Sequence, residues 1–198
     1  MKKSSLLTIF FLSVVFISSA QKTYNDSMQA FIKSYVEKHE VVIGEDKKLM
    51  AFYPVNKNYR VVANFERVKN GKWFTMETSA NSKQTFRVYG TIRFTLHDTS
   101  VQLNIYQSQK LMLVPEYKDN LFLPFTDLTS GEETYASGRY IDLIFDDIID
   151  NKVVIDFNKA YNPYCCYATG YHCPIPPKEN ALTVAINAGE KKYSKPIH

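Results

Sequence analysis

The chain has 198 residues, 22% of them charged, and its formal net charge at pH 7 is +4. A charge balance this weak does not favour nucleic acid or an anionic membrane surface as a partner. Fourteen Tyr and thirteen Phe beside only seven Gly exclude a low-complexity or disordered chain and favour a β-rich domain.

Residues 1–20 have the pattern of an export signal. Lys2 and Lys3 precede an apolar run over residues 6–17, and Ser18-Ser19-Ala20 supplies the small residues that a signal peptidase requires. The apolar run is shorter than the ~20 residues needed to span a bilayer, so we expect cleavage after Ala20 rather than an uncleaved anchor. We therefore predict an exported protein, periplasmic or extracellular, with no transmembrane anchor after cleavage.

The remaining residues, 21–198, are predicted to form a single domain. Removing twenty of the 198 residues leaves 178, which is enough for one sizeable core. The 24 Lys and Arg residues lose Lys2 and Lys3, so 22 basic residues face 20 acidic ones and the net charge falls to +2. Neither an internal repeat nor a linker interrupts this part, and its pattern specifies no oligomeric state.

The first element after the signal is an expected amphipathic helix packed against a sheet. Its apolar residues recur at helical spacing. They are Tyr24, Met28, Phe31, Ile32, Tyr35 and Val36.

From Leu49 onward apolar and polar residues alternate, which is typical of antiparallel strands with one wet face. Asn70-Gly71 predicts a hairpin between a strand ending at Val68 and one containing Trp73. Gly90, inside a long expected strand, predicts a bend or bulge. We expect a mainly β fold of roughly nine or ten strands, a curled antiparallel sheet forming a sandwich or a partly closed barrel.

Several function classes lack their sequence signatures. Neither GxGxxG nor a P-loop motif is present, so we expect no nucleotide cofactor, and no other cofactor is indicated. No GxSxG motif surrounds Ser130, which gives a serine hydrolase little support. The histidines are also few. They are His39, His97, His172 and His198.

Polar and turn-forming residues are concentrated between Asp127 and Asn180. The first part, Asp127 to Tyr135, is read more readily as a surface turn than as a site, because Asp, Thr, Ser and Gly are the residues a turn uses. The next strand places Arg139 on one face, with Tyr140 and Asp142 on the other.

Asp156 and Asn158 are the most informative pair, because both project from the face opposite the predicted core residues of their strand. A carboxylate beside an amide can bind a sugar hydroxyl, an amine or a water molecule. If that face is buried, Asp156 needs a partner, and Arg139 is the expected one through a bidentate ion pair. In that case Asp156 and Arg139 would form only a structural ion pair. The sequence does not decide between this structural role and a ligand-binding role for Asp156.

These features favour a small polar or carbohydrate-like ligand in a cleft formed by residues 127–142 and 156–162. The ligand-binding candidates are Asp127, Tyr135, Arg139, Asp142, Asp156, Asn158, Tyr161 and Asn162. One alternative is a hydrolase that pairs the carboxylate of Asp156 with Glu133, Asp142 or Asp127, with no catalytic residue assigned. The other is an envelope structural protein without a ligand.

The three cysteines lie in a Tyr-rich loop that ends in prolines. In an exported protein they predict one disulfide, in which Cys173 pairs with Cys165 or Cys166. A metal site using these cysteines and His172 is disfavoured because neither a CxxC nor an HxxxH spacing accompanies them, so no metal is expected.

Ordered motif pieces along nearly the whole mature chain resemble one known family. Upstream, these pieces are Phe52-Tyr53-Pro54, Tyr59-Arg60-Val61 and Tyr89-Gly90. The longest run is Asp127-Leu128-Thr129-Ser130-Gly131-Glu132-Glu133-Thr134-Tyr135. Further along come Gly138-Arg139-Tyr140-Ile141-Asp142, Asp156-Phe157-Asn158, Ala160-Tyr161-Asn162-Pro163, Cys173-Pro174-Ile175-Pro176-Pro177, Glu179-Asn180 and Ala188-Gly189-Glu190.

The chain resembles the bacterial domain-of-unknown-function family 1684. The resemblance implies a bacterial and often exported protein with no assigned activity. It also places the paired cysteines at Cys165 and Cys173 and leaves Cys166 as a free thiol outside the family pattern. His172 is not a position that the motif specifies, which further disfavours a metal site.

Overall fold

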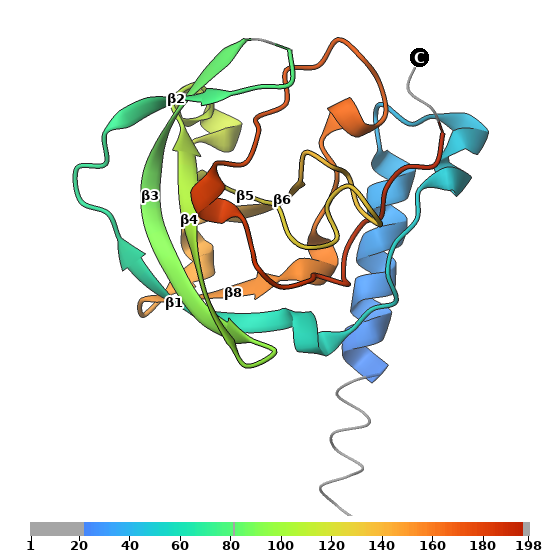
Figure 1. Cartoon of the computed structure of the whole chain (residues 1–198), viewed down its shortest axis with the longest axis horizontal. Helices are drawn as coiled ribbons and strands as arrows, with labels where there is room; N and C mark the ends of the chain where they lie inside the picture. Colours follow the sequence, from blue (N-terminus) through green and yellow to red (C-terminus); the bar gives the residue numbers. More distant parts are fainter. Residues whose placement is uncertain (1–21, 81, 196–198) are drawn as a thin grey trace, which may run out of the picture.

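One curled antiparallel sheet forms the body of the protein (Figure 1). The structure, a computed structural model, describes residues 22–80 and 82–195. The predicted signal segment and its cleavage after Ala20 lie outside the described residues. No helix in the described part of the chain is both long and apolar enough to cross a membrane.

The described residues form eight strands in the order β6-β5-β4-β3-β1-β8-β7, with β2 paired to β3 off this path. The strands are β1 (Arg60–Arg67), β2 (Trp73–Glu77), β3 (Lys83–Leu96), β4 (Thr99–Ser108), β5 (Asn120–Phe125), β6 (Arg139–Ile144), β7 (Ile148–Ile149) and β8 (Lys152–Asp156). The mainly β, antiparallel prediction is confirmed. The sheet curls but is not closed, since no pairing joins its two end strands within the described residues.

Helical structure is confined to one α-helix over residues 22–38 and to short 3₁₀ turns in the described chain. The turns are η1 (Gly44–Leu49), η2 (Lys57–Tyr59), η3 (Leu111–Leu113), η4 (Pro115–Tyr117), η5 (Phe145–Asp147), η6 (Phe157–Lys159), η7 (Tyr164–Cys166) and η8 (Lys178–Asn180).

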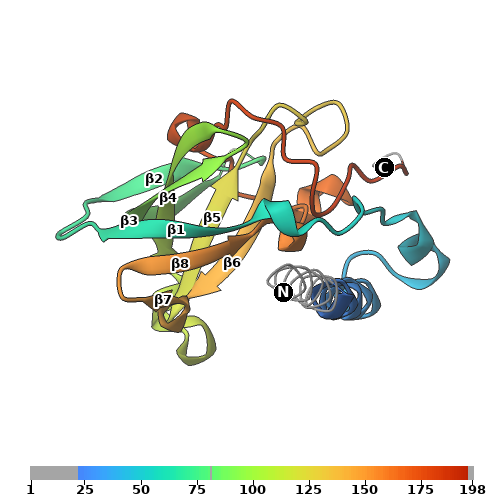
Figure 2. The ribbon, with the colours of Figure 1, turned by 90° about the horizontal axis from the view of Figure 1, so that it is seen from below.

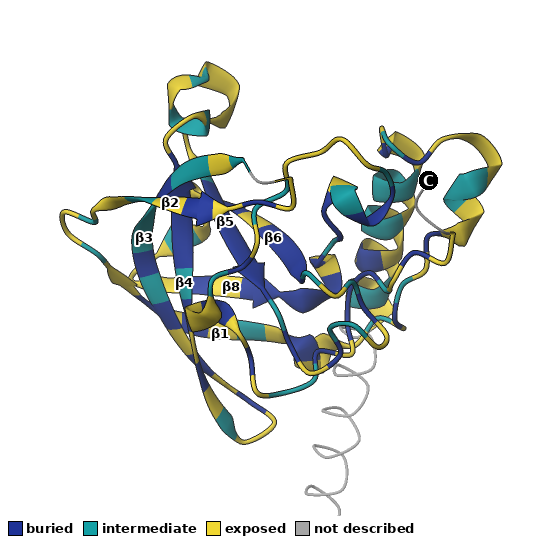
Figure 3. Ribbon diagram, turned by 45° about the horizontal axis from the view of Figure 1, so that its top comes forward, coloured by how far each residue is buried: buried dark blue, intermediate teal, exposed yellow. Residues whose placement is uncertain are grey.

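The main core fills the concave side of the sheet. Cross-strand neighbours such as Phe65 and Ile92, or Leu123 and Ile141, meet there and are buried (Figure 3). Ile155 of β8 joins the same cluster, so strands from both ends of the sheet share one core. Burying such side chains stabilises the fold by about 1.5–3 kcal/mol each.

The Asn70-Gly71 turn forms, but the predicted β1–β2 hairpin is wrong. β1 and β2 both pair with β3, at Arg67–Gly90 and Trp73–Arg87, and not with each other. The turn, with Asn70 at φ 59°, therefore connects β1 and β2, which pair with successive parts of β3. The predicted irregularity at Gly90 is confirmed by a register shift in the β3–β4 pairing, where an added Cβ would collide with the Phe65 ring.

The helix lies beside the curled sheet (Figure 2). Its Tyr35 and Val36 pack on a small cluster that includes Cys166, Tyr167 and Tyr193 from the C-terminal third of the chain. The predicted helix is therefore present, and its C-terminal part packs on this cluster.

The loop of residues 165–173, closed by a disulfide, is hydrogen-bonded to the chain just after β2, and we call this loop the clasp. Cys165 and Cys173 form a disulfide with their Cα atoms 6.2 Å apart, as the resemblance implied, and Cys166 is free and buried. Burial raises the pKa of the Cys166 thiol to about 12, so it is inert at neutral pH. The amide of Ser79 donates to the Cys173 carbonyl at 3.0 Å, which joins the clasp to the end of β2.

Candidate functional site

Arg139 and Asp127 form a fully enclosed ion pair. The Arg139 guanidinium is 0% exposed, and its Nη2 lies 2.9 Å from Asp127 Oδ2. The same guanidinium donates to the carbonyls of Ile186, Ala188 and Glu190. This group therefore ties the C-terminal segment to β6, and a ligand cannot reach it.

Asp127 also organises the turn that follows β5. Its Oδ1 accepts the Thr129 amide at 2.8 Å, the Thr129 hydroxyl at 2.6 Å and the Ile186 amide at 3.1 Å. The Ser130 hydroxyl in turn accepts the Asp127 amide. Each polar side chain of this stretch that the turn encloses is bonded within the protein, so the turn interpretation describes it best.

The expected Arg139–Asp156 ion pair is wrong. Asp156 lies on β8 opposite Arg60 of β1, whereas the Arg139 guanidinium is enclosed with Asp127 and the Ile186 carbonyl. Asp156 instead accepts the Tyr24 hydroxyl, at 3.0 Å to Oδ1 and 2.9 Å to Oδ2. It thereby fastens the helix to the sheet.

Asn158 completes this attachment. It is 2% exposed, and its Nδ2 donates to Asp156 Oδ1, to the Tyr24 hydroxyl and to the Asn56 carbonyl, each at 2.9 Å. Its Oδ1 accepts the Asn56 amide at 2.9 Å. We expected the carboxylate of Asp156 and the amide of Asn158 to bind a ligand. They form hydrogen bonds with Tyr24 and Asn56 instead.

Glu190 is a second enclosed carboxylate, and only its place in a motif distinguishes it in the sequence. It is 0% exposed and accepts the Tyr167 hydroxyl at 2.5 Å, the Asn162 amide at 2.9 Å and the Tyr35 hydroxyl at 3.3 Å. Burial raises its pKa to about 7, although these hydrogen bonds and the charge of Arg139 oppose the rise.

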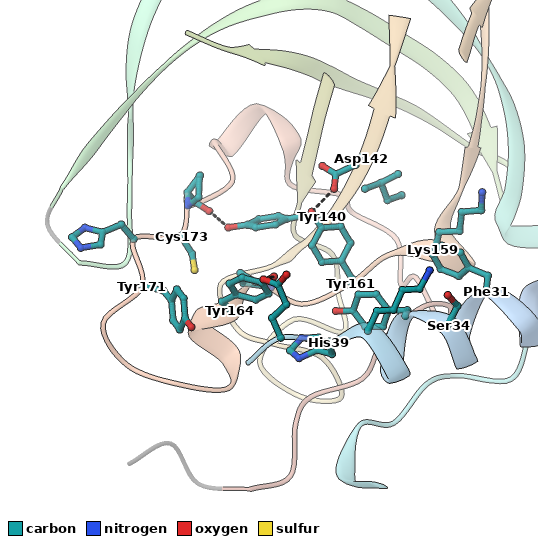
Figure 4. A pocket seen from close by; sticks show the side chains of 17 residues that line it. Phe31, Ser34, His39, Tyr140, Asp142, Lys159, Tyr161, Tyr164, Tyr171 and Cys173 are labelled. Carbon is teal, nitrogen blue, oxygen red and sulfur yellow. Dashed lines mark hydrogen bonds between the residues drawn. The ribbon is translucent and has the colours of Figure 1, made fainter. Parts of the chain in front are cut away.

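A large cavity in the described structure lies between the helix, β6, η6 and the clasp (Figure 4), and we call it the aromatic cleft. Its volume is about 770 Å³. Six Phe and Tyr side chains line it: Phe31, Tyr35, Tyr140, Tyr161, Tyr164 and Tyr171. Its polar side chains are Ser34, Lys38, His39, Glu40, Asp142, Lys159 and His172.

Asp142 and Tyr161 form the hydrogen-bonded pair of this cleft. The Tyr161 hydroxyl donates to Asp142 Oδ2 at 2.7 Å (Figure 4). Asp142 reaches solvent through the cleft, yet protein crowds its other sides. This desolvation raises the pKa of Asp142 against the opposing bonds from Tyr161 and Asn120, and burial with the Asp142 charge raises the pKa of Tyr161. Tyr161 is therefore a neutral donor to the carboxylate.

Other tyrosines around the cleft are held by their hydroxyls. Tyr140 donates to the Pro174 carbonyl, and Tyr164 donates to Glu40 Oε2 at 3.5 Å. Rings fixed in this way meet a ligand with little further loss of side-chain freedom.

His39 contributes a buried donor that the sequence did not reveal. Its Nδ1 accepts the Val42 amide at 2.9 Å, so in the neutral ring the proton sits on Nε2. Burial lowers the pKa of His39, which favours that neutral ring. Nε2 has no hydrogen-bond partner within the described part of the chain, and the imidazole packs edgewise against Tyr164 and Tyr167.

A smaller cavity of about 220 Å³ adjoins the cleft, and we call it the seam pocket. It lies where β6 faces β1, β8 and η6 across the opening of the sheet. It is lined by Arg60, Ile141, Asp142, Leu143, Asp147, Val154, Asp156 and Lys159. Three of these side chains, Ile141, Asp142 and Lys159, also line the aromatic cleft.

The eight predicted ligand-binding residues are thus not gathered in one site. Asp142 and Tyr161 line the aromatic cleft, and Asp156 lines the seam pocket. Tyr135 is half-buried and donates to the Cys165 carbonyl, while Asp127, Arg139, Asn158 and Asn162 are buried and bonded within the protein. Cleft residues that sequence reasoning missed include Phe31, His39, Tyr140, Lys159 and Tyr164.

No group of three or more His, Cys, Asp or Glu side chains is placed to hold a metal ion in residues 22–80 and 82–195.

Comparison with known proteins places this architecture in a family. The model of the family described as "Protein of unknown function (DUF1684)" matches residues 47–191. The chain belongs to the DUF1684 family. The matched part contains all eight described strands and the clasp, whereas the helix that walls the cleft precedes it.

A solved relative shares the DUF1684 chain's fold. The solution NMR structure of an uncharacterised protein of Haloarcula marismortui is 26% identical, with a TM-score of 0.67. The similarity covers 90% of this chain and 99% of that chain. No curated protein matches the chain.

Proposed function

We propose that this DUF1684 protein is an exported binding module that holds a small polar, carbohydrate-like ligand in the aromatic cleft. The observation that carries the proposal is the Asp142–Tyr161 pair, a solvent-reachable carboxylate set among fixed aromatic rings. Export is supported by the Cys165–Cys173 disulfide, because such bonds persist in oxidising compartments.

The cleft has the size and lining of a ligand site. Its volume of about 770 Å³ falls within the roughly 300–1,000 Å³ of small-molecule pockets, which are mostly apolar with a few polar groups. Tyr164 is 37% exposed and presents its ring there. A sugar has apolar C–H faces that pack on such rings, and hydroxyls at its edge that need both donors and acceptors.

The charged groups of the cleft are balanced, which favours a neutral ligand with many hydroxyls. Asp142 and Glu40 supply carboxylates, while Lys38 and Lys159 supply ammonium groups. Lys159 Nζ lies 5.4 Å from the centre of the Phe31 ring, so a donor stands beside an aromatic face. A ligand hydroxyl can donate a hydrogen bond to a carboxylate and accept one from an ammonium group.

The test is a binding screen by calorimetry and thermal shift, with glucose, galactose and N-acetylglucosamine and their short oligomers. The Tyr164→Ala variant should bind the best sugar about tenfold more weakly, because it loses a stacking face. Tyr117→Ala is the matched control, since Tyr117 is exposed on η4 and lines neither cavity. Failure of every sugar to bind the wild-type protein would overturn the proposal.

A second candidate is a hydrolase with paired carboxylates, favoured by Asp142 and Asp156 lining one seam pocket. Asp127 is enclosed with Arg139, and Glu133 is ion-paired to Lys191 at 3.2 Å and lines neither cavity. Of the three expected partners of Asp156, Asp142 is the one in the same cavity. Turnover of a glycan that Asp156→Asn abolishes without lowering the melting temperature would favour this candidate.

A further inference from the structure

We propose that the ligand is an oligosaccharide whose chain runs from the aromatic cleft, past Asp142, into the seam pocket. The inference rests on the proposed function, and it makes the seam pocket a second sugar subsite. It follows from how the two cavities join, from the size of the smaller one and from the side chains that line it.

The two cavities meet at β6 and η6. Ile141 and Asp142 of β6 and Lys159 of η6 line both of them, so a ligand bound beside these side chains faces both cavities. The seam pocket exists because the sheet does not close, which leaves β6 facing Arg60 of β1 and Val154 of β8 without strand pairing.

The seam pocket is too small to be a separate site. Its volume of about 220 Å³ is below the roughly 300–1,000 Å³ usual for a small-molecule pocket, whereas the adjoining cleft is within that range. A pocket of this size next to a larger one accommodates one part of a ligand whose other part fills the cleft.

Its lining suits hydroxyl groups rather than a strongly charged group. Asp142 and Asp147 provide acceptors, while Arg60 and Lys159 provide donors. Arg60 Nε lies 3.9 Å from Asp156 Oδ2, which is beyond hydrogen-bond distance, and its side chain is 41% exposed. A sugar unit there could accept from Arg60 and donate to a carboxylate.

The helix walls the cleft but not the seam pocket. Phe31, Ser34, Tyr35 and Lys38 line the cleft, and none of the seam residues comes from residues 22–38. A chain that leaves the cleft past Asp142 therefore meets the sheet and η6, and the helix need not move. The aromatic subsite and the polar subsite would bind successive sugar units.

The test compares monosaccharides with their oligomers on the full mature protein and on a plugged variant. Calorimetry with N-acetylglucosamine, glucose and their dimers to tetramers should show about tenfold or more tighter binding of the longer members in one series. Val154→Trp should remove this gain and preserve monosaccharide affinity, because Val154 lines the seam pocket. Val62→Trp is the matched control, since Val62 is the exposed cross-strand neighbour of Val154 and lines neither cavity.

Equal affinity for monosaccharide and oligomer, or a length gain that survives in Val154→Trp, would overturn this inference and leave the proposed function standing. Absence of binding by any of the sugars would overturn both. Should Val154→Trp fold poorly, amide NMR shifts of the wild-type protein decide the question. The inference requires oligomers, and not monosaccharides, to shift the amides of Arg60, Asp147 and Val154.

Discussion

Arg139 and Asp142 stand three positions apart on β6, yet the protein uses them in opposite ways. Arg139 points into the curled sheet, is 0% exposed and is bonded to Asp127 and to backbone carbonyls. Asp142 points to the other side, into the aromatic cleft beside Tyr161. Polar residues that are clustered in the sequence thus separate into an enclosed set and a solvent-accessible set through strand alternation.

The energetic consequence of this difference is large. An enclosed charge that loses its partner is expensive, because no water replaces the lost bonds. A carboxylate at the wall of a cleft keeps contact with solvent, so its removal changes stability little. Variants of the two residues should therefore separate stability from binding.

The largest stability effect is expected for Arg139→Met, which leaves Asp127 buried without its cation. Unfolding free energy measured in urea should fall by about 3–5 kcal/mol. Arg93→Met is the control, because Arg93 pairs with Glu66 on the exposed surface and such pairs contribute up to about 1 kcal/mol. If Arg139→Met were as mild as Arg93→Met, the structural role of the enclosed pair would be refuted.

Glu190 should make stability depend on pH. Its folded-state pKa, about 7, is raised from 4.5, so between these values the folded protein holds a proton that the unfolded chain has lost. The stabilising contribution is therefore complete below pH 4.5 and is lost as pH rises through 7. Between pH 4.5 and 7, the free energy of unfolding of the wild-type protein should fall by on the order of 3 kcal/mol relative to that of Glu190→Gln. Parallel stability curves for the two proteins would contradict the assignment.

Tyr24→Phe tests whether Asp156 and Asn158 serve to attach the helix. The variant removes the hydroxyl that donates to Asp156 and accepts from Asn158. We expect a loss of about 1–3 kcal/mol in stability, with faster amide hydrogen exchange over residues 22–38. Unchanged exchange in the helix would show that this contact does not hold it, and Tyr117→Phe controls for removal of an exposed hydroxyl.

Asp142→Asn should give the smallest change in stability. Because desolvation raises the pKa of Asp142, a neutral amide of the same shape should leave the melting temperature unchanged or slightly higher at pH 7. Sugar affinity should fall about tenfold, through loss of a charged acceptor. A clear loss of stability with intact binding would reverse the roles assigned to Asp142 and Arg139.

The sequence predicts the fold well where local periodicity decides it. Alternation in β1 and β3, the helix over Tyr24 to Val36 and the bulge at Gly90 follow from side-chain spacing. The Asn70-Gly71 hairpin was predicted wrongly because a turn motif fixes the local backbone and not the partner strand. The long β3 pairs with both flanking segments, and this outcome depends on packing across the whole sheet.

The site is less predictable because its walls come from distant segments. Asp142 and Tyr161 are among the expected residues, but the enclosure of Arg139 by Asp127 and the C-terminal segment, which keeps it from Asp156, is not encoded locally. Phe31 and His39 belong to segments that carry no site motif. Their position follows from the attachment of the helix through Tyr24 and Tyr35, which only the folded chain shows.

The enclosed and the accessible set are compared most directly by an NMR titration of isotope-labelled protein, residues 21–198, with the best sugar of the screen. We expect amide shifts at Tyr140, Asp142 and Tyr161, with Asp127 and Arg139 unaffected. Shifts absent from the aromatic cleft, or gathered around the enclosed ion pair, would contradict this expectation.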